Sequence, residues 1–404
     1  MRNPTHSVPA LWLVLLAAAG TFALTMGTRQ TMGLFMSPMN TATGLGVGSI
    51  SLAFAFGQLW WGLTQPFAGA IADRVGTGRV LVTGVVLVAL GTFITPLMTS
   101  TAGLIFSIGV LAAGGAGMAG PSVLMAATTR MVPAERRGIA TGMVNAGGSF
   151  GQFLMAPLAI GLSASLGWAS AMQVLGLLVL LALPAAWVLK GNALQSAPAG
   201  QKRLSAREAI AEAFRLPSFW MLSAGFLVCG FHVAFMATHL PGVIAECGLP
   251  VQVGGWALAM IGLFNIFGSF GMGWAVGRWR MKSLLSLVYA SRALAITLFL
   301  LAPKTEVTVL VFAAVMGVTF LSTVPPTAGL VAKFFGTANM AMLFGIVMVA
   351  HQVGGFMGAW LGGRVFEATG SYNIVWIIDI LLAVGAALVH LPIKEKMLVK
   401  PAAA

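Results

Sequence analysis

Long apolar runs, each about the length of a membrane-spanning helix, alternate along the chain with short polar segments. One α-helix needs about 20 mostly apolar residues to cross the hydrocarbon core of a bilayer. Dividing the chain at its charged residues, prolines and polar glycine clusters leaves twelve such runs, at residues 11–36, 48–72, 79–98, 102–127, 138–162, 168–189, 218–241, 252–276, 283–302, 306–330, 340–363 and 372–392. The pattern predicts an all-α polytopic membrane protein with twelve transmembrane helices.

The composition of the 404-residue chain supports this interpretation. Apolar residues make up 58% of the chain and charged residues only 8%, whereas soluble domains carry about 25% charged residues. Soluble enzymes and nucleic-acid-binding domains are therefore excluded. The net charge of +13 does not indicate a nucleic-acid partner, because the basic residues lie in the short segments between apolar runs. The expected surroundings of the protein are a lipid bilayer.

Basic residues concentrate in alternate segments between the runs, and this asymmetry predicts the orientation. Cytoplasmic loops of membrane proteins carry more lysine and arginine than outer loops do. If both termini lie inside, the inner segments hold 18 of the 22 lysines and arginines. These are Arg2, Arg74, Arg79, Arg130, Arg136, Arg137, Lys190, Lys202, Arg203, Arg207, Arg215, Arg278, Arg280, Lys282, Lys333, Lys394, Lys396 and Lys400. We expect a multi-pass protein of a bacterial inner membrane with both termini in the cytoplasm.

The longest hydrophilic stretch, residues 190–216, follows the sixth run and divides the chain into two halves. The predicted organisation is an N-terminal six-helix bundle at 1–189, a cytoplasmic linker at 190–216 and a C-terminal six-helix bundle at 217–404. Within the linker, Ser205 is followed three residues later by Glu208, and apolar residues then recur at helical spacing. This capping-box pattern predicts a short surface helix.

Two sequence runs of the first half recur in the second half at nearly the same offset. The segment that begins at Gly69 (GAIADR) matches the segment at Gly273 (GWAVGR), 204 positions later. The run that begins at Gly142 (GMVNAGGSFGQFLMAPL) matches the run at Gly345 (GIVMVAHQVGGFMGAWL), 203 positions later. A parallel repeat of this kind predicts two bundles related by an axis along the membrane normal, with a substrate site between them.

The polar segment Gly69–Arg79 (GAIADRVGTGR) links the second and third runs. It resembles the loop signature of the major facilitator superfamily, G-x-x-x-D-R-x-G-x-x-[RK], and the resemblance extends over essentially the whole chain. The resemblance implies a gating role for four residues, Asp73, Arg74, Gly76 and Arg79. Asp73 would face the positive N-terminal end of the eleventh helix and hold the two halves in one state. The second copy of the segment lacks this acid.

Arg29 lies in the outer half of the first predicted helix. A charged residue at membrane depth is costly unless it faces the bundle interior or water. On a helix, Arg29 shares a face with Thr25, Met26 and Gly33, and a guanidinium among such neighbours suits bidentate binding of a carboxylate. The alternative is an arginine that extends to the outer membrane surface.

The stretch around Arg29 is also similar to the first helix of the monocarboxylate transporter family, in which Arg29 takes the position of a lysine. The Gly147–Gly151 run (GGSFG) and the segment before the eleventh helix resemble the same family and its oxalate–formate relatives. The acidic-Gly-Gly-Trp signature of the animal members is absent, and Asn265 stands where they carry an Asp-Arg pair. The resemblance implies transport of small organic anions, with Arg29 binding the substrate.

Three histidines within the predicted helices are further candidates. His232 and His239 are seven positions apart on the seventh helix and share a face. His232 is either a substrate ligand that titrates near neutral pH or a partner in a bond between helices, and His239 is a candidate gating residue. We expect no metal site, because no third ligand lies near them. His351 and Gln352 in the eleventh helix form either a second polar anchor opposite Arg29 or a packing pair.

Other polar residues in the predicted helices either line a central cavity or join helices to each other. Gln58, Asn145 and Asn265 are the candidates for substrate binding among them. Arg292 and Asp379 fall on the ninth and twelfth helices, which are outer helices in the superfamily that the chain resembles. A structural role is expected for both.

The sequence contains neither the H-E-x-x-H motif nor the phosphate loop G-x-x-x-x-G-K-[ST]. We therefore expect no enzyme activity, no cofactor, and transport driven by gradients. The leading hypothesis is a monomeric secondary transporter of small organic anions, with monocarboxylates favoured and with proton symport and anion exchange both open. The alternative is an exporter of drugs or cationic compounds in the same superfamily. It is less favoured because Asp379 is the only acid in the middle of a predicted helix.

Single cysteines at Ser196 and Ala42 test the orientation, in a background where Cys229 and Cys247 are replaced by serine. We expect a membrane-impermeant thiol reagent to label Ser196→Cys from the cytoplasm and Ala42→Cys from outside, because the linker is inside and the segment after the first helix is outside. Labelling from the opposite sides would contradict the orientation.

Overall fold

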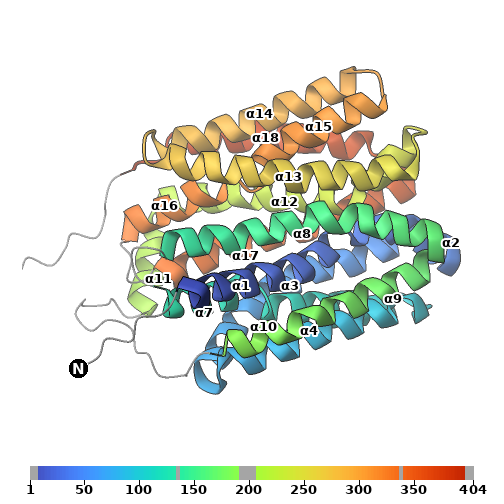
Figure 1. The fold of residues 1–404 in the computed structure, drawn as a ribbon. Coiled ribbons are helices and arrows are strands. Elements are labelled where there is room, and N and C mark those ends of the chain that lie inside the picture. The colour runs from blue at the N-terminus through green and yellow to red at the C-terminus, as the bar shows by residue number, and fades with distance from the viewer. Residues whose placement is uncertain (1–7, 133–136, 191–205, 336–339, 396–404) are drawn as a thin grey trace, which may run out of the picture.

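The computed structural model describes residues 8–132, 137–190, 206–335 and 340–395, and the regular elements in these ranges are all helices (Figure 1). The helices of the first half are α1 (Val8–Gln30), α2 (Met36–Thr43), α3 (Val47–Val75), α4 (Thr77–Ile94), α5 (Thr101–Leu104), α6 (Gly114–Met118), α7 (Pro121–Met131), α8 (Arg137–Leu166), α9 (Trp168–Val179) and α10 (Leu183–Val188). Those of the second half are α11 (Ala206–Arg215), α12 (Pro217–Glu246), α13 (Val251–Val276), α14 (Met281–Leu301), α15 (Glu306–Thr319), α16 (Val324–Phe335), α17 (Met340–Thr369) and α18 (Asn373–His390). Short 3-10 turns join α1 to α2 and α9 to α10, and a π-helical stretch, Ile105–Ala113, joins α5 to α6.

The predicted twelve-helix membrane fold is confirmed. Among the described residues, 11 helical runs are long and apolar enough to cross a membrane. The twelfth is α3, which has 29 residues and carries Gln58 and Gln65 among small residues, so that its mean hydropathy is lower. The helices lie side by side along one common direction (Figure 1).

The helices pack as two six-helix bundles. In the first bundle α1 packs along α8, and α4 packs along α9 and the π-helical stretch; in the second, α12 packs along α17, α14 along α18 and α13 along α15. Two helix pairs carry most of the contact between the bundles, α3 with α17 and α8 with α13.

Glycine contacts show the internal repeat in three dimensions. A Cβ built at Gly151 of α8 would overlap the backbone of Ala23 in α1, and a Cβ at Gly354 of α17 would overlap the backbone of Leu227 in α12. Gly151 and Gly354 are 203 positions apart, and Ala23 and Leu227 are 204 apart, the offsets of the sequence repeat. Each bundle therefore contains the same close helix crossing, which only glycine permits.

Two helices that the sequence predicts as continuous are broken. The run predicted at 102–127 is interrupted between Met118 and Pro121, and the run predicted at 306–330 is interrupted between Thr319 and Val324. Pro121 and Pro325 follow the breaks, 204 positions apart, and proline supplies no backbone N–H for the preceding turn. Both runs still form membrane spans, Thr101–Thr128 and Glu306–Phe335, and the break within each span is part of the repeat.

The two ends of the bundles differ. The end that carries Val8, the α3–α4 turn at Gly76 and the last residue of α18 is here called the termini end, and the opposite end is called the far end. At the far end the bundles touch. A Cβ at Gly33, after α1, would overlap the carbonyl oxygens of Ala237 and Thr238 in α12, and Gly48 of α3 abuts the carboxylate of Glu367 in α17.

Toward the termini end α3 and α17 separate. Gly62 of α3 packs against Gln352 of α17, but Gly69, seven residues further on the same face of α3, has no described atom within 4 Å of a built Cβ. The same holds for Gly345, seven residues from Gln352 on α17. The α3–α17 pair therefore diverges beyond Gly62, whereas at the other bundle contact a Cβ at Gly142 of α8 would still lie 3.8 Å from the Phe270 ring of α13.

The linker is described only in part. Residues 191–205, including Ser205 of the predicted capping box, lie outside the described residues, and the division at 190–216 stays a prediction. The surface helix after Ser205 is present as α11, with Ala209 and Ala213 buried and Arg207 and Glu208 exposed. Trp220 of α12 donates from its indole nitrogen to the carbonyl of Phe214, at 2.8 Å, and ties α11 to the second bundle.

The far-end contact at Gly33 yields a test. Gly33→Val places a side chain against the backbone of α12, so we expect the far end to open more often. The readout is labelling of Ile108→Cys, a buried position, by a thiol reagent applied from the far side. We predict an increase in rate of about tenfold, which corresponds to about 1.4 kcal/mol in the closed–open equilibrium.

Gly20→Val on α1 is the matched control, because no described atom lies within 4 Å of a Cβ there. Its labelling rate should equal that of the parent protein. Equal rates for Gly33→Val and Gly20→Val would show that the Gly33 contact does not hold the far end closed.

Candidate functional site

The helical run that contains Arg29 is longer than the sequence predicts. It continues to Thr43, so that Leu11–Thr43 spans 33 residues and Arg29 lies just beyond the middle of the run. The run is longer than expected because the 3-10 turn Met32–Phe35 joins α1 to α2 without leaving the helical path. The half-buried Arg29 side chain turns toward α3.

The guanidinium of Arg29 has three described neighbours. It donates to Oε1 of Gln58 in α3. It lies over the ring of Trp61, one turn further along α3, with 4.7 Å between its central carbon and the ring centroid. Its second terminal nitrogen lies 3.8 Å from the Met26 sulfur, a weak acceptor. Since guanidinium has five N–H donors, most of its donor capacity remains for a ligand.

Arg29 is not a partner in the ion pairs described for Asp379, Glu395 and Glu367. A cation in a water-poor site without a counter-charge costs several kcal/mol. Cation–π contact with Trp61 recovers part of that cost. Arg29 is therefore a site where an anion binds favourably.

A pocket of about 40 Å³ lies beside the guanidinium. This volume holds on the order of two or three waters, or a carboxylate group. Its walls come from the first bundle and from α12 of the second: Arg29, Gln30, Met32 and Gly33; Phe54, Gly57 and Gln58; Val88 and Thr92; Ile108, Ala112 and Ala113; Ala237 and Thr238. The pocket is therefore an apolar chamber with one cation and a few neutral polar groups, at the contact between the bundles.

Sequence reasoning missed Gln30, Thr92 and Thr238 as lining residues. Thr92 lies in α4, where the surrounding pattern is uniformly apolar. Thr238 lies between His232 and His239, which are the stronger candidates on that helix. The available signal was a hydroxyl or amide inside a membrane helix, but that signal also marks ordinary bonds between helices.

Of the predicted substrate ligands, the structure brings Gln58 to Arg29. Gln352 of α17 reaches α3 at Gly62, next to Trp61, and is buried with no hydrogen-bond partner for its Nε2 among the described atoms. It lies at the edge of this region and does not line the pocket.

His351 points into the second bundle. Its ring lies 4.8 Å from that of Phe226 in α12, and its side chain interacts with Cys229. Its Nδ1 has no described hydrogen-bond partner. In this conformation His351 therefore does not line the Arg29 pocket.

His232 is also remote from the Arg29 pocket. Its Nε2 lies 2.9 Å from Oδ1 of Asp379 in α18, and its Nδ1 lies 3.2 Å from a guanidinium nitrogen of Arg292 in α14. All three side chains are at most 1% exposed. They form a separate buried charged cluster inside the second bundle.

Asn265 and Asn145 lie at the α8–α13 contact. Asn265 donates to the Ser149 hydroxyl across the bundles, at 2.8 Å, and accepts from the backbone N–H of Leu321 at the break between α15 and α16, at 3.0 Å. Asn145 shares a face of α8 with Ser149 and Gln152, which are buried, but Asn145 is exposed.

His239 sits within the second bundle near the far end. Its Nε2–H donates to the carbonyl of Ala359 at 2.7 Å, and its Nδ1 lies 3.3 Å from the Tyr372 hydroxyl. Burial and the neighbouring Glu246 carboxylate raise the pKa of Tyr372, so its hydroxyl stays protonated and donates to Nδ1. His239 thus ties together α12, α17 and the start of α18.

The predicted gating segment is partly described. Gly76 has a φ of 94° and ends α3 while starting α4, a conformation that favours glycine. Arg74 and Arg79 are exposed at the termini end. The side chain of Asp73 and residues 336–339, before α17, lie outside the described residues, so the contact of Asp73 with the eleventh helix stays a prediction.

Two repeated six-helix bundles with a pocket at their contact have the architecture of membrane transporters with parallel repeats. The family model of the Major Facilitator Superfamily matches residues 17–359. The chain belongs to the Major Facilitator Superfamily of transporters.

Proteins of known sequence and structure agree with this assignment. An uncharacterized MFS-type transporter of Bacillus subtilis, YcxA, is 24% identical, over 96% of this chain and 97% of its own. Monocarboxylate transporter 13 of rat is 24% identical, over 94% and 89%, and the oxalate:formate antiporter of Oxalobacter formigenes is 23% identical, over 94% and 91%. The crystal structure of a bacterial homologue of the human lysosomal transporter Spinster, inward-facing and occupied, superposes with a TM-score of 0.78 at 15% identity, over 95% and 97% of the chains.

The melting temperature of the protein can test whether Arg29 lacks a counter-charge. Gln58→Glu places a carboxylate on the guanidinium without changing side-chain size. We expect the free energy of unfolding to rise by up to about 3 kcal/mol, the upper value for hydrogen bonds to charged groups, and the melting temperature to rise with it.

Gln65→Glu is the matched control on the same helix. Gln65 accepts from the Ser122 hydroxyl at 2.6 Å and has no cationic partner among the described residues, so Gln65→Glu should lower the melting temperature. If both substitutions lowered it equally, Arg29 would not be an uncompensated cation.

Proposed function

We propose that the protein is a secondary transporter of small monocarboxylates, and that Arg29 binds the substrate carboxylate. Substrate enters the pocket between the bundles and leaves on the other side after the bundles rock. Protons or a counter-anion provide the driving gradient. The transport step includes no covalent chemistry and requires no cofactor.

One observation carries this proposal: the guanidinium of Arg29 borders a pocket at the bundle contact and has no described carboxylate as a partner. Gln58 holds one edge of the guanidinium and Trp61 covers its face. The remaining N–H groups form a planar fork that matches a carboxylate. Apolar walls such as Val88 and Ile108 suit the short carbon chain behind it.

Two relatives support the same substrate class, the rat monocarboxylate transporter and the bacterial oxalate:formate antiporter. An exporter of cationic compounds is the alternative within the superfamily. Such an exporter requires an acid toward its pocket, whereas the pocket described here contains an arginine and no acid. The electrostatics therefore favour anions.

We infer that both termini are cytoplasmic and that the protein resides, as a monomer, in the bacterial plasma membrane. The concentration of basic residues in the inner segments supports this orientation. The conformation that is closed at the far end is then inward-facing. The same orientation leads to a hypothesis for the gating segment, in which Asp73 stabilises the state that is closed at the termini end. Asp73→Asn should then lower the transport rate more than the affinity for substrate.

Arg29 substitutions test the proposal on purified protein. The measurement is the shift of melting temperature produced by formate, acetate, L-lactate and pyruvate. Arg29→Lys keeps the charge but loses the planar fork, so we expect affinity to fall by about 1–2 kcal/mol, or about 5- to 30-fold. Arg29→Gln should abolish the shifts while the protein remains folded.

Arg278→Gln is the control, because Arg278 is exposed at the termini end and lies over Trp274. It should show the parent shifts. If Arg29→Gln also kept these shifts, the pocket would not be the anion site. If cationic ligands, but none of the four anions, raised the melting temperature of the parent protein, the exporter alternative would replace the proposal.

A further inference from the structure

A second buried charged cluster lies in the middle of the C-terminal bundle, outside the anion pocket. Asp379 of α18 and Arg292 of α14 face opposite edges of the His232 ring in α12, with 2.9 Å between Asp379 Oδ1 and Nε2 and 3.2 Å between Nδ1 and Arg292. Asp379 is 0% exposed, and His232 and Arg292 are each 1% exposed. Ionisable residues at this depth are costly and mark proton or substrate sites more often than packing.

The geometry assigns the protonation state of this conformation. Guanidinium only donates hydrogen bonds, so Nδ1 of His232 accepts from Arg292 and carries no proton. Nε2 then carries the proton and faces Asp379. The cluster therefore holds one positive charge, one neutral imidazole and one negative charge.

The Asp379 carboxylate has unused acceptor capacity. Although Oδ1 lies close to His232, neither carboxylate oxygen has a well-oriented hydrogen bond among the described residues. Nε2 also lies 3.2 Å from the backbone oxygen of Asp379 and divides its single proton between two acceptors. The carboxylate oxygens therefore have lone pairs that are open to a proton.

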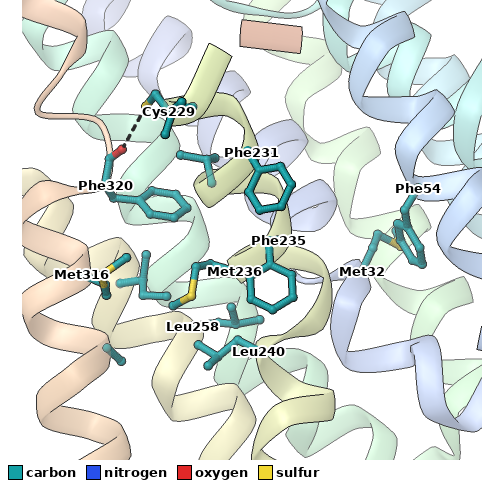
Figure 2. Packing of buried hydrophobic residues seen from close by; sticks show 14 of the residues in the cluster. Met32, Phe54, Cys229, Phe231, Phe235, Met236, Leu240, Leu258, Met316 and Phe320 are labelled. Atoms are coloured by element: carbon teal, nitrogen blue, oxygen red, sulfur yellow. Dashed lines mark hydrogen bonds between the residues drawn. The ribbon is translucent and has the colours of Figure 1, made fainter. Parts of the chain in front are cut away.

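Arg292 connects the cluster to the break between α15 and α16. Its guanidinium donates to the carbonyl oxygens of Thr319 and Phe320, to the latter at 2.9 Å. These are free C-terminal carbonyls of α15, which bear partial negative charge. Figure 2 shows Phe320 facing Cys229 of α12, whose thiol makes a 3.9 Å contact with the same carbonyl. Asn265 binds the next residue of the break from α13.

Other titratable groups surround the cluster on each packed helix. On α14, the Tyr289 ring lies 6.3 Å from that of His232 and 5.4 Å from the Arg292 central carbon. On α18, His390 stacks on Tyr289 with 5.2 Å between centroids, at the termini end. Cys229 on α12 and His351 on α17 complete the set. These groups lead from the cluster toward the termini end, and none of them carries a second carboxylate.

We propose that Asp379 and His232 form a proton-binding site, distinct from the anion pocket, that acts on the break in the tenth membrane span through Arg292. When a proton binds to Asp379, the carboxylate becomes neutral and Arg292 loses its counter-charge. The described acceptors that bind Arg292 are then all neutral, among them the carbonyls of the α15–α16 break, so proton binding changes the hydrogen bonds at a point where the helix is interrupted. Its role as the coupling site for an anion rests on the proposed function, but proton binding itself does not.

α12 provides the mechanical link between the two sites. His232 lies six residues before Thr238, which lines the anion pocket, so about 9 Å along one rigid helix separates them. The far-end contact of Gly33 is made to the same turn of α12. A shift of α12 caused by protonation therefore changes both the pocket and the far-end contact.

The experiment uses the full-length protein in lipid nanodiscs with no substrate. Infrared difference spectra are recorded while the pH falls from about 8 to about 5. We expect the carbonyl band of a protonated buried carboxylic acid to appear in the parent protein and to be lost in Asp379→Asn. Glu246→Gln is the matched control in the same bundle, because Glu246 accepts from the backbone N–H of Tyr372 at the far end, and it should keep the band.

Distances between spin labels provide the second readout. Ala42 and Val307 are exposed on the two bundles near the far end. We expect the distance distribution to shift with pH in the parent protein and not in Asp379→Asn. If the single variant does not fold, the neutral pair Arg292→Gln/Asp379→Asn replaces it and should likewise lack both responses.

The proton site would be wrong if the parent protein showed no band. It would also be wrong if the band survived in Asp379→Asn or in the neutral pair, or if it were lost in Glu246→Gln. A band without a pH-dependent distance shift would overturn the link to conformation. Because no anion is present, these results do not depend on the Arg29 substitutions, and failure of one proposal is distinguishable from failure of the other.

Discussion

Every backbone polar group in the spanning part of this protein has to find its partner inside the protein, because the hydrocarbon core provides no water. That constraint explains the all-helical fold, in which backbone groups bond within each segment. It also explains the close glycine crossings of α1 with α8 and of α12 with α17, which leave no space for unsatisfied groups. At the interrupted tenth span, Arg292 and Asn265 bind the backbone groups that the break frees.

The same constraint explains why the two arginines within the membrane spans, Arg292 and Arg29, suit different functions. Arg292 has an acid within the same cluster and two carbonyl acceptors, and its cluster is neutral in total. Arg29 has a neutral amide, an aromatic face and a thioether sulfur. A buried cation without a counter-charge is stabilised when an anion enters. The Arg292 cluster therefore suits proton exchange within the protein, and the Arg29 site suits an anion from outside the protein.

Hydrophobic pattern and repeat were enough to predict the twelve helices and the two bundles, because length and apolar content alone determine which segments can span a bilayer. The breaks at Pro121 and Pro325 were not predictable in the same way. Pro66, Pro157 and Pro241 lie inside continuous helices, so a proline by itself does not distinguish a kink from a break. Tertiary partners decide, and at the break before Pro325 the partner is the guanidinium of Arg292 from another helix.

The candidate site was predictable only as far as single residues. Arg29 is conspicuous in the sequence as a charge within a span, but its contact with Gln58 depends on the register of α1 against α3. His232 is equally conspicuous, yet its partners lie 60 and 147 positions away on helices that were expected to be structural. Sequence pattern identifies the costly residues, whereas packing determines which of them meet.

The central claim is that a carboxylate binds at Arg29. Crystals of the protein grown with 3-bromopropionate test it most directly, because anomalous scattering from bromine locates the ligand independently of the protein model. The account predicts a bromine peak in the pocket between Arg29, Val88 and Thr238, with the carboxylate on the guanidinium, and no peak there in Arg29→Gln. A peak at another site, or the same peak in Arg29→Gln, would contradict it.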